Sequence, residues 1–244
     1  MKLVCLGTGG YFPNDRRHTA GYLFPELGIL FDAGSSAYRV IDCLQTDELD
    51  IFLSHAHLDH IVGLTFLLVP MHRKKIKTVR VHARAEDILA IKQHLLASQI
   101  FPVDIPFEYH EITGTVDLGK RGKVSTMPLR HPGGSLGYRI DWLDKSFAYI
   151  TDTSWVNDYL EFVRGVDLLL HECYFPDGAE DLAELTGHSC TSQVTKLAKQ
   201  AEVKHLGLIH IDPFRTDDDP IGIDAAQAIF PNTFVAEDND ELDF

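Results

Sequence analysis

Hydrophobic positions along the chain follow two periodicities. Short apolar runs bounded by turn residues predict β-strands, whereas apolar residues recurring every three or four positions predict helices. The expected strands are residues 2–6, 20–24, 28–31, 49–53, 78–82, 107–112, 123–127, 136–140, 147–151, 166–170, 205–209 and 233–236. The expected helices are residues 35–44, 59–71, 85–97, 191–201 and 223–229. This alternation predicts a layered α/β fold in which helices cover sheets.

Composition narrows the class of protein. The 244 residues are 45% hydrophobic and 24% charged, as in ordinary globular domains, and we expect one domain spanning residues 1–244. A net charge of −14 argues against a general polyanion binder, because phosphate backbones are bound by many Lys and Arg side chains. The acidic runs at residues 217–219 and 237–243 are expected to be solvated.

The cysteines and the apolar runs indicate a compartment. None of the four cysteines forms a CxxC pair, so we expect reduced thiols in a cytoplasmic protein. No apolar run is long enough to cross a bilayer, and no secretory leader is expected.

Residues able to bind metal stand where four apolar strands end. They are His55, Asp152, His171 and His210. Functional sites in open α/β sheets gather at the carboxyl ends of strands, where loops leave the rigid scaffold. Convergence of several such ends would make a cage of nitrogen and oxygen ligands without any cysteine.

The densest group of ligand-type residues is the segment His55-Ala56-His57-Leu58-Asp59-His60. His55 and His57 are two positions apart, so both point one way if the loop is extended. Asp59 and His60 open the predicted helix that follows and can face a second point nearby. The spacing predicts two metal ions about 3.5–4 Å apart, as in hydrolytic two-metal sites.

With this HxHxDH motif the chain resembles the metallo-β-lactamase superfamily. The motif lies within residues 51–64, IFLSHAHLDHIVGL. The Gly-rich residues 6–10, followed by Pro13 and Arg17, and the segment FDAG at residues 31–34 resemble its ribonuclease Z and phosphodiesterase branch. The resemblance implies a four-layer αββα sandwich.

The resemblance also implies a ligand set. His55, His57 and His131 would bind one metal, Asp59, His60 and His210 the other, and Asp152 would bridge the two. These ligands suit Zn²⁺, and they also accept Mn²⁺ or Fe. Two such ions lower the pKa of a shared water, so that a metal-bridging hydroxide can attack near neutral pH.

Three further residues bear on the branch. An aspartate at position 152, where the best-known zinc β-lactamases carry a cysteine, points to another branch of the superfamily. His188, in the segment GHSCT, resembles a histidine that contacts the scissile phosphate and protonates the leaving oxygen. Glu172 matches the branch's HEA-type element and is expected to orient His188. We expect His171 to be a packing residue, and Cys173 and Cys190 to be inert thiols.

The segment between His131 and Asp152 bears on the substrate. Only 21 positions separate these residues, whereas ribonuclease Z enzymes usually insert a long basic arm there that grips tRNA. The single basic run, at residues 72–75, is interpreted as a solvated helix end.

We therefore expect a dinuclear metal-dependent phosphodiesterase acting on a small phosphorylated substrate, such as a cyclic nucleotide or cyclic sugar phosphate. Asp59, His188 and Glu172 are the catalytic candidates. The alternatives are an arm-less ribonuclease Z-like enzyme acting on RNA 3′ ends, a thioester, lactone or lactam hydrolase, and a non-hydrolytic redox or binding protein that uses the metal. The resemblance also implies a homodimer, and no membrane partner is expected.

Overall fold

The computed structural model describes residues 1–244, and the chain divides into two compact units. Unit 1 comprises residues 1–113 and 237–243, and unit 2 comprises residues 114–236 together with residue 244. Each unit is built on one seven-stranded mixed sheet. None of the helices combines the length and the apolar character needed to cross a lipid bilayer.

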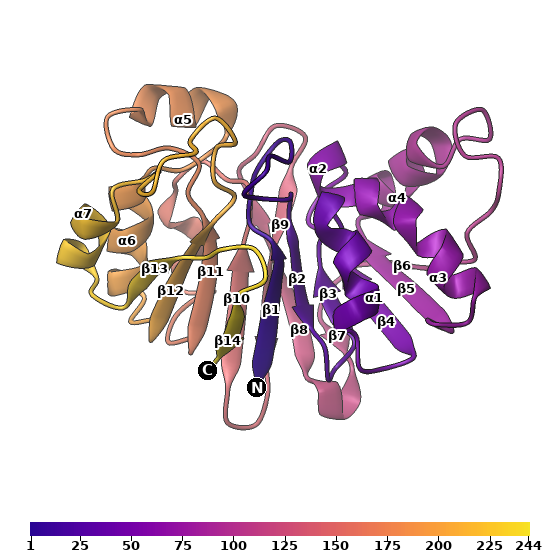
Figure 1. The fold of residues 1–244 in the computed structure, drawn as a ribbon. Helices are drawn as coiled ribbons and strands as arrows, with labels where there is room; N and C mark the ends of the chain where they lie inside the picture. Colours follow the sequence, from indigo (N-terminus) through magenta and orange to yellow (C-terminus); the bar gives the residue numbers. More distant parts are fainter. The chain divides into compact units, whose positions relative to one another are not determined.

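Unit 1 has the sheet order β14-β1-β2-β3-β4-β5-β6. Strands β14 to β3 pair antiparallel and strands β3 to β6 pair parallel, with α1 to α4 lying over one face (Figure 1). The elements are β1 (Lys2–Gly7), β2 (Gly21–Phe24), β3 (Ile29–Phe31), α1 (Val40–Cys43), β4 (Glu48–Phe52), α2 (Leu58–Ile61), α3 (Leu68–His72), β5 (Thr78–Ala83), α4 (Ala85–Ala90), β6 (Glu108–Glu111) and β14 (Glu241–Asp243).

Alternate residues of the parallel strands form the core of unit 1. Leu49 and Ile51 of β4 and Val79 and Val81 of β5 are fully buried in one cluster with the helices. Residues two apart point to the same face of a strand, so these four side chains face the helices together. The strand ends are thereby held in a rigid frame, and β4 leads directly into the loop that begins at Leu53.

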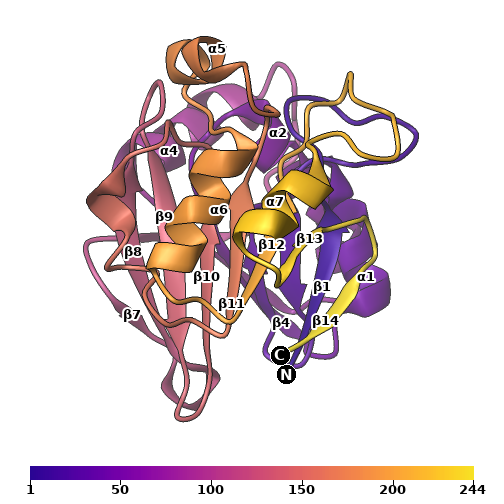
Figure 2. The same cartoon turned by 90° about the vertical axis from the view of Figure 1, so that its left-hand side faces the viewer.

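Unit 2 has the sheet order β13-β12-β11-β10-β9-β8-β7. Strands β10 to β13 pair parallel, the others pair antiparallel, and α6 and α7 cover one face (Figure 2). The elements are β7 (Val116–Asp117), β8 (Lys123–Leu129), β9 (Ser135–Asp141), β10 (Ser146–Ile150), β11 (Leu168–Glu172), α5 (Glu180–Thr186), α6 (Thr191–Gln200), β12 (His205–Ile209), α7 (Ile223–Ile229) and β13 (Thr233–Val235).

The strand directions in unit 2 bring four chain segments to one edge. β8 and β10 are both antiparallel to β9, so they run the same way, and β11 and β12 are parallel to β10. The carboxyl ends of β8, β10, β11 and β12 therefore share one edge of the sheet. Residues 131, 152, 172 and 210 all stand at or just beyond these ends.

The helix predicted over residues 59–71 is instead broken into three pieces. α2 is followed by a 3₁₀ segment, Val62–Leu67, and then by α3. Gly63 packs so closely that a Cβ there would lie 2.1 Å from the carbonyl oxygen of Gly34. Pro70, in the first turn of α3, lacks an N–H group and so cannot donate a helical hydrogen bond to the segment before it. Close packing against the neighbouring loop overrides the helical periodicity.

The helix predicted over residues 85–97 also changes character, because α4 passes into a π-helical segment, Ile91–Leu95. Helix α5 was missed by the sequence analysis. Its leucines, Leu182 and Leu185, are exposed, so the segment lacks the buried apolar face that a periodic pattern reports.

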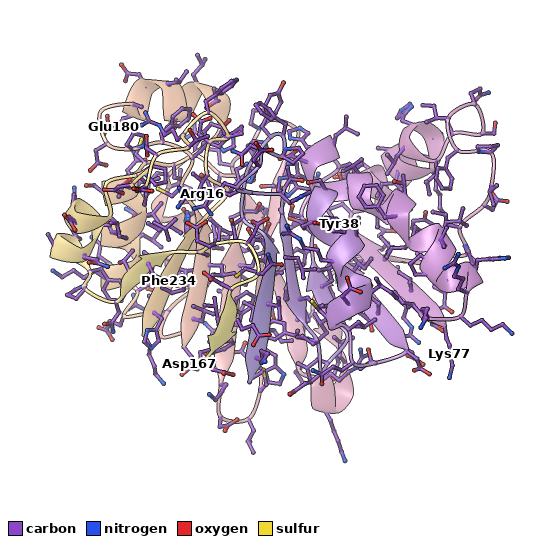
Figure 3. The ribbon with its side chains drawn as sticks, in the orientation of Figure 1. Arg16, Tyr38, Lys77, Asp167, Glu180 and Phe234 are labelled. Carbon is purple, nitrogen blue, oxygen red and sulfur yellow. The ribbon has the colours of Figure 1, made fainter.

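The acidic tail at residues 237–243 is solvated only in part, since Glu241 and Asp243 are exposed as expected and Asp238 is not. Asp238 has a side chain only 5% exposed and accepts hydrogen bonds from Thr8, from the backbone N–H of His18 and from Arg39. Glu237 pairs with Arg16, labelled in Figure 3, and with the buried Arg17. β14 then pairs with β1. The acidic run at residues 217–219 is exposed, as predicted.

Candidate metal centre

The HxHxDH segment forms the loop and first helical turn after β4 in unit 1. The ring centroid of His55 lies 4.4 Å from that of His57 and 4.3 Å from that of His60. His55 and His60 are buried, while His57 is exposed. The short loop thus gathers three imidazoles.

A buried aspartate fixes the orientation of this loop. Asp32, which follows β3, accepts hydrogen bonds from the backbone N–H (2.7 Å) and the hydroxyl (2.8 Å) of Ser54, and from Nδ1 of His60 (2.8 Å). Because the Ser54 hydroxyl donates to Asp32, its oxygen accepts from Nδ1 of His55, 2.9 Å away. Both imidazoles then carry the proton on Nδ1, and Nε2 is the ligating atom of each.

The fourth residue of the segment, Asp59, opens α2. Its Oδ2 lies 3.2 Å from Nε2 of His60 and accepts the backbone N–H of Tyr11 (3.0 Å) from the Gly-rich loop after β1. Tyr11 has a φ of +59°, in the left-handed region. The Gly-rich segment therefore holds the Asp59 carboxylate against its neighbouring imidazole.

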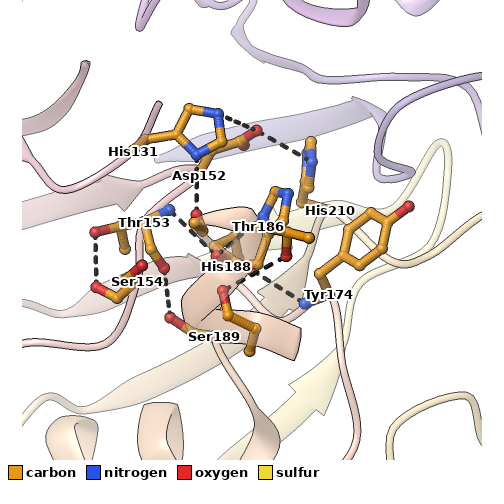
Figure 4. Close-up of polar contacts among 12 residues, drawn as sticks. His131, Asp152, Thr153, Ser154, Tyr174, Thr186, His188, Ser189 and His210 are labelled. Atoms are coloured by element: carbon orange, nitrogen blue, oxygen red, sulfur yellow. Dashed lines mark hydrogen bonds and ion pairs between the residues drawn. The ribbon is translucent and has the colours of Figure 1, made fainter. Parts of the chain in front are cut away.

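Unit 2 places His131, Asp152 and His210 together at its shared strand edge (Figure 4). Oδ2 of Asp152 lies 3.3 Å from Nε2 of His210 and 3.8 Å from Nε2 of His131. One carboxylate oxygen thus faces two imidazoles. Asp152 and His210 are buried, and the side chain of His131 is only 4% exposed.

His131 is oriented by the loop that precedes α6. Its Nδ1 donates to the carbonyl of Gly187 (2.9 Å), which leaves Nε2 as the ligating nitrogen. Gly187 has a φ of +81°, and a Cβ there would lie 2.8 Å from Nδ1 of His131 and 2.4 Å from Pro132. Only glycine suits this close approach.

His188 stands between the two imidazoles of unit 2. Its ring centroid lies 5.4 Å from that of His131 and 5.5 Å from that of His210. Its Nδ1 is 3.3 Å from Oε1 of Glu172. The sequence analysis predicted that Glu172 orients His188, and the distance is consistent with that role.

The carboxylate of Glu172 is fully buried at the end of β11. It accepts the backbone N–H groups of Thr153 (3.2 Å) and Tyr174 (3.0 Å). Burial raises the pKa of Glu172, and the adjacent His188 acts in the opposite direction. The two N–H groups hold the carboxylate in place beside His188.

Two residues near the centre were not found from the sequence. Asp32 was noted only within the FDAG segment at residues 31–34, and Tyr174 was given no role. The Tyr174 ring stacks on His188, with centroids 4.6 Å apart and 19° between planes. Ser189, in the loop before α6, donates its hydroxyl proton to the carbonyl of Thr153 (2.7 Å). The N-cap of α6 is Cys190.

His171 is a packing residue, as predicted. Its Nδ1 donates to the carbonyl of Glu172 (2.7 Å), and its Nε2 accepts from the hydroxyl of Tyr159 (3.0 Å). Burial lowers the pKa of His171 to about 4, so the ring is neutral near pH 7. Burial also raises the pKa of Cys173 and that of Cys190, the latter to about 12, so both stay protonated thiols.

His82 is a strand residue outside the assigned ligand set. It is buried in β5 with its Nε2 2.7 Å from Oδ1 of Asp50, and its ring stacks on Phe52. This second buried Asp–His pair of unit 1 involves none of the expected ligands.

The donor geometry within each unit suits a small divalent cation. A tetrahedral ion with bonds of 2.0–2.1 Å separates its ligand atoms by about 3.4 Å. The Asp59–His60 and Asp152–His210 separations, 3.2 and 3.3 Å, are close to this value. Imidazole and carboxylate donors without thiolate suit Zn²⁺, Mn²⁺ and Fe²⁺. These groups support divalent metal binding.

The chain matches a known family over most of its length. A family model described as the β-lactamase superfamily domain matches residues 28–211. Ribonuclease Z from Archaeoglobus fulgidus is 26% identical over 98% of this chain and 96% of that protein. Ribonuclease Z from Metallosphaera sedula is 27% identical over 98% and 97%.

Solved structures resemble the chain over its full length. The metallo-β-lactamase fold protein YhfI from Bacillus subtilis gives a TM-score of 0.81 at 22% identity, covering 99% of this chain and 98% of that one. The short form of human tRNase Z gives 0.78 at 20% identity, covering 100% and 98%. A diphosphatase of the PhnP family gives 0.75 at 21% identity, covering 100% and 96%. With two mixed sheets flanked by helices, the predicted αββα sandwich class is confirmed.

Proposed function

This chain belongs to the β-lactamase superfamily, as a ribonuclease Z-like metal-dependent hydrolase, and we propose that it hydrolyses small phosphodiesters at a dinuclear metal centre. The proposed substrates are cyclic nucleotides or cyclic sugar phosphates. The observation that carries the proposal is the His188–Glu172 pair standing beside His131 and His210.

We assign the metal ligands from the family motif and from the donor geometry of each unit. His55, His57 and His131 would hold one divalent ion, and Asp59, His60 and His210 the other, with Asp152 shared. When bound, two such ions supply a nucleophile from water near neutral pH and neutralise charge on phosphoryl oxygens. Zn²⁺ is the proposed ion, since it suits these donors best.

The protein's own contribution is to place a proton donor. Glu172, fixed by two backbone N–H groups, lies 3.3 Å from Nδ1 of His188 and so favours the protonated imidazole. The opposite nitrogen, Nε2, is then available to donate a proton to the leaving oxygen. A histidine suits this step because its ordinary pKa lies near neutrality.

Three observations favour a small substrate over RNA. The chain between His131 and Asp152 forms only β9 and β10, which leaves no arm to hold a tRNA body. The alignment with the A. fulgidus enzyme spans 295 positions and this chain has 244 residues, so at least 51 aligned positions have no counterpart here. The net charge of −14 opposes binding to a polyanion.

The test uses the metal-loaded protein and bis(p-nitrophenyl) phosphate. We expect p-nitrophenolate release from protein with two metal ions per chain, and a loss of at least 10²-fold in kcat/KM for Asp59→Ala. Phe214→Ala changes an exposed side chain outside the assigned ligand set, so it controls for losses of activity during purification and metal loading. Retained turnover in Asp59→Ala would contradict the assignment, and iron with O₂ consumption would favour a redox protein.

A second candidate is an arm-less nuclease acting on RNA 3′ ends. It is favoured by the curated relatives, which are named ribonuclease Z and align over nearly the whole chain. A precursor-tRNA cleavage assay separates it from the first candidate. Thioester, lactone and lactam substrates tested in parallel address hydrolysis of other bonds.

A further inference from the structure

We propose that Tyr174 is a positioning residue, whose ring fixes the imidazole of His188 in the orientation needed for proton donation to the leaving group. The inference deepens the proposed function and rests on it. Tyr174 lies two residues beyond the end of β11 and is partly exposed beside the unit 2 ligands (Figure 4). The sequence analysis assigned it no part.

The ring and the backbone of Tyr174 act on the same pair of residues. The ring stacks face to face on His188, with centroids 4.6 Å apart and 19° between planes. The backbone N–H donates to Oε2 of Glu172 (3.0 Å), while Oε1 of that carboxylate faces Nδ1 of His188 (3.3 Å). One residue therefore contacts both members of the pair.

These contacts restrict the two rotations left to the imidazole. Glu172 attracts one edge of the ring, which sets where Nδ1 points but leaves the ring free to swing about that contact. A flat ring stacked over the imidazole removes this swing, because tilting either ring loses the stacking contact. The imidazole is then held beside the ligand rings, with its centroid 5.4 Å from that of His131 and 5.5 Å from that of His210.

Tyr174 also contacts the ligand His210, with centroids 5.7 Å apart and 43° between planes. The ring therefore spans from the proton donor to a ligand and fixes the distance between them. The neighbouring Phe175 meets His188 only edge-on, at 6.3 Å and 67°, and is itself buried. Phe175 provides an aromatic control that packs nearby without stacking.

The test measures how the rate depends on the leaving group. Methyl 4-nitrophenyl phosphate releases a weakly basic phenolate that needs little protonation, whereas methyl phenyl phosphate releases a more basic one. Proton donation by His188 therefore matters more for the second substrate. We compare kcat/KM for phenol release by the metal-loaded full chain and by variants with the same metal content.

Tyr174→Leu is expected to lower kcat/KM about tenfold for methyl phenyl phosphate and less than threefold for methyl 4-nitrophenyl phosphate. His188→Ala should show the same selectivity, and Tyr174→Leu should add nothing in the His188→Ala background, because both changes remove one function. Tyr174→Phe keeps the ring and should restore the wild-type leaving-group dependence. Phe175→Leu should leave that dependence unaltered, whatever its effect on stability.

Three results would overturn the inference. One is an equal loss on both substrates in Tyr174→Leu, another is a further loss when it is combined with His188→Ala, and the third is a failure of Tyr174→Phe to rescue. If Tyr174→Leu does not fold, Tyr174→Met takes its place, since it fills similar volume without a ring. A metal-loaded wild-type protein that cleaves neither diester refutes the proposed function itself. If His188→Ala loses the wild-type leaving-group dependence and Tyr174→Leu keeps it, only the role of Tyr174 is refuted.

Discussion

The Asp32–His60 contact makes a quantitative prediction about metal affinity. Asp32→Asn replaces a fully buried carboxylate by an amide of nearly the same shape. The residue has a φ of +56°, which asparagine adopts more readily than most residues, so backbone strain changes little. The substitution therefore isolates the charge and the hydrogen-bond acceptors.

The expected loss follows from what Asp32 accepts. Three donors converge on the carboxylate: the N–H and hydroxyl of Ser54, and Nδ1 of His60 at 2.8 Å. An amide has one oxygen, so at least one donor would face its NH₂ group. Loss of the partner that orients a ligand histidine typically weakens metal binding 10–100-fold, or about 1.4–2.7 kcal/mol. Because one donor would face the NH₂ group, we expect the loss of metal affinity in Asp32→Asn to be about 100-fold.

The assay is competition for Zn²⁺ against a chromophoric chelator at neutral pH. Asp50→Asn is the matched control, because Asp50 makes a similar buried contact, 2.7 Å, to His82 in the same sheet. Both variants should lose stability in urea, but only Asp32→Asn should lose affinity for metal. Wild-type affinity in Asp32→Asn, or an equal loss in Asp50→Asn, would refute the reasoning.

Other features give sharp expectations. The folded-state pKa of His171, about 4, lies below its unfolded value, so the free energy of unfolding is greatest above about pH 6.5 and falls by about 3 kcal/mol toward pH 4. In urea unfolding measured against pH, His171→Leu should take up one proton fewer on unfolding than the wild type. Gly187→Ala should displace His131 and weaken metal binding at least tenfold by chelator competition, whereas Gly178→Ala, with a φ of +94° and open space around it, should cost stability alone. Asp238→Ala should lower the free energy of unfolding by about 3 kcal/mol, measured with denaturant, because Arg39 would keep a half-buried charge without this partner.

Local sequence patterns predicted much of the fold and the group of candidate ligands that lies in one short segment. The candidate ligands at the strand ends, His55, Asp152 and His210, were predicted because apolar runs of strand length stop there. The segment from His55 to His60 was singled out because its ligand-type residues lie within one short loop. What the loop bends around, however, is not local: Gly63 is pressed against the backbone near Gly34, and this contact breaks the predicted helix.

Residues brought in by tertiary structure escaped the sequence analysis. Asp32 is 28 positions from His60, and their contact depends on the parallel pairing of β3 with β4. Tyr174 reaches His188 through the turn after β11, which no periodicity describes. The acidic tail was expected to be solvated because charge runs usually are, but Asp238 meets Arg39 and the N-terminal loop. The single domain over residues 1–244 and the seven-residue ligand set stay predictions.

The pairing of β14 with β1 has a consequence for synthesis. Lys2 lies opposite Asp243, so β1 receives its outer neighbour from a strand that is made much later in synthesis. Until then β1 has one unpaired edge, and the loop that carries Thr8 and Tyr11 lacks the two hydrogen bonds that Thr8 donates to Asp238. A nascent chain that halts before residue 237 therefore exposes a template for mispairing, and maturation of unit 1 must wait until residues 237–243 have emerged from the ribosome.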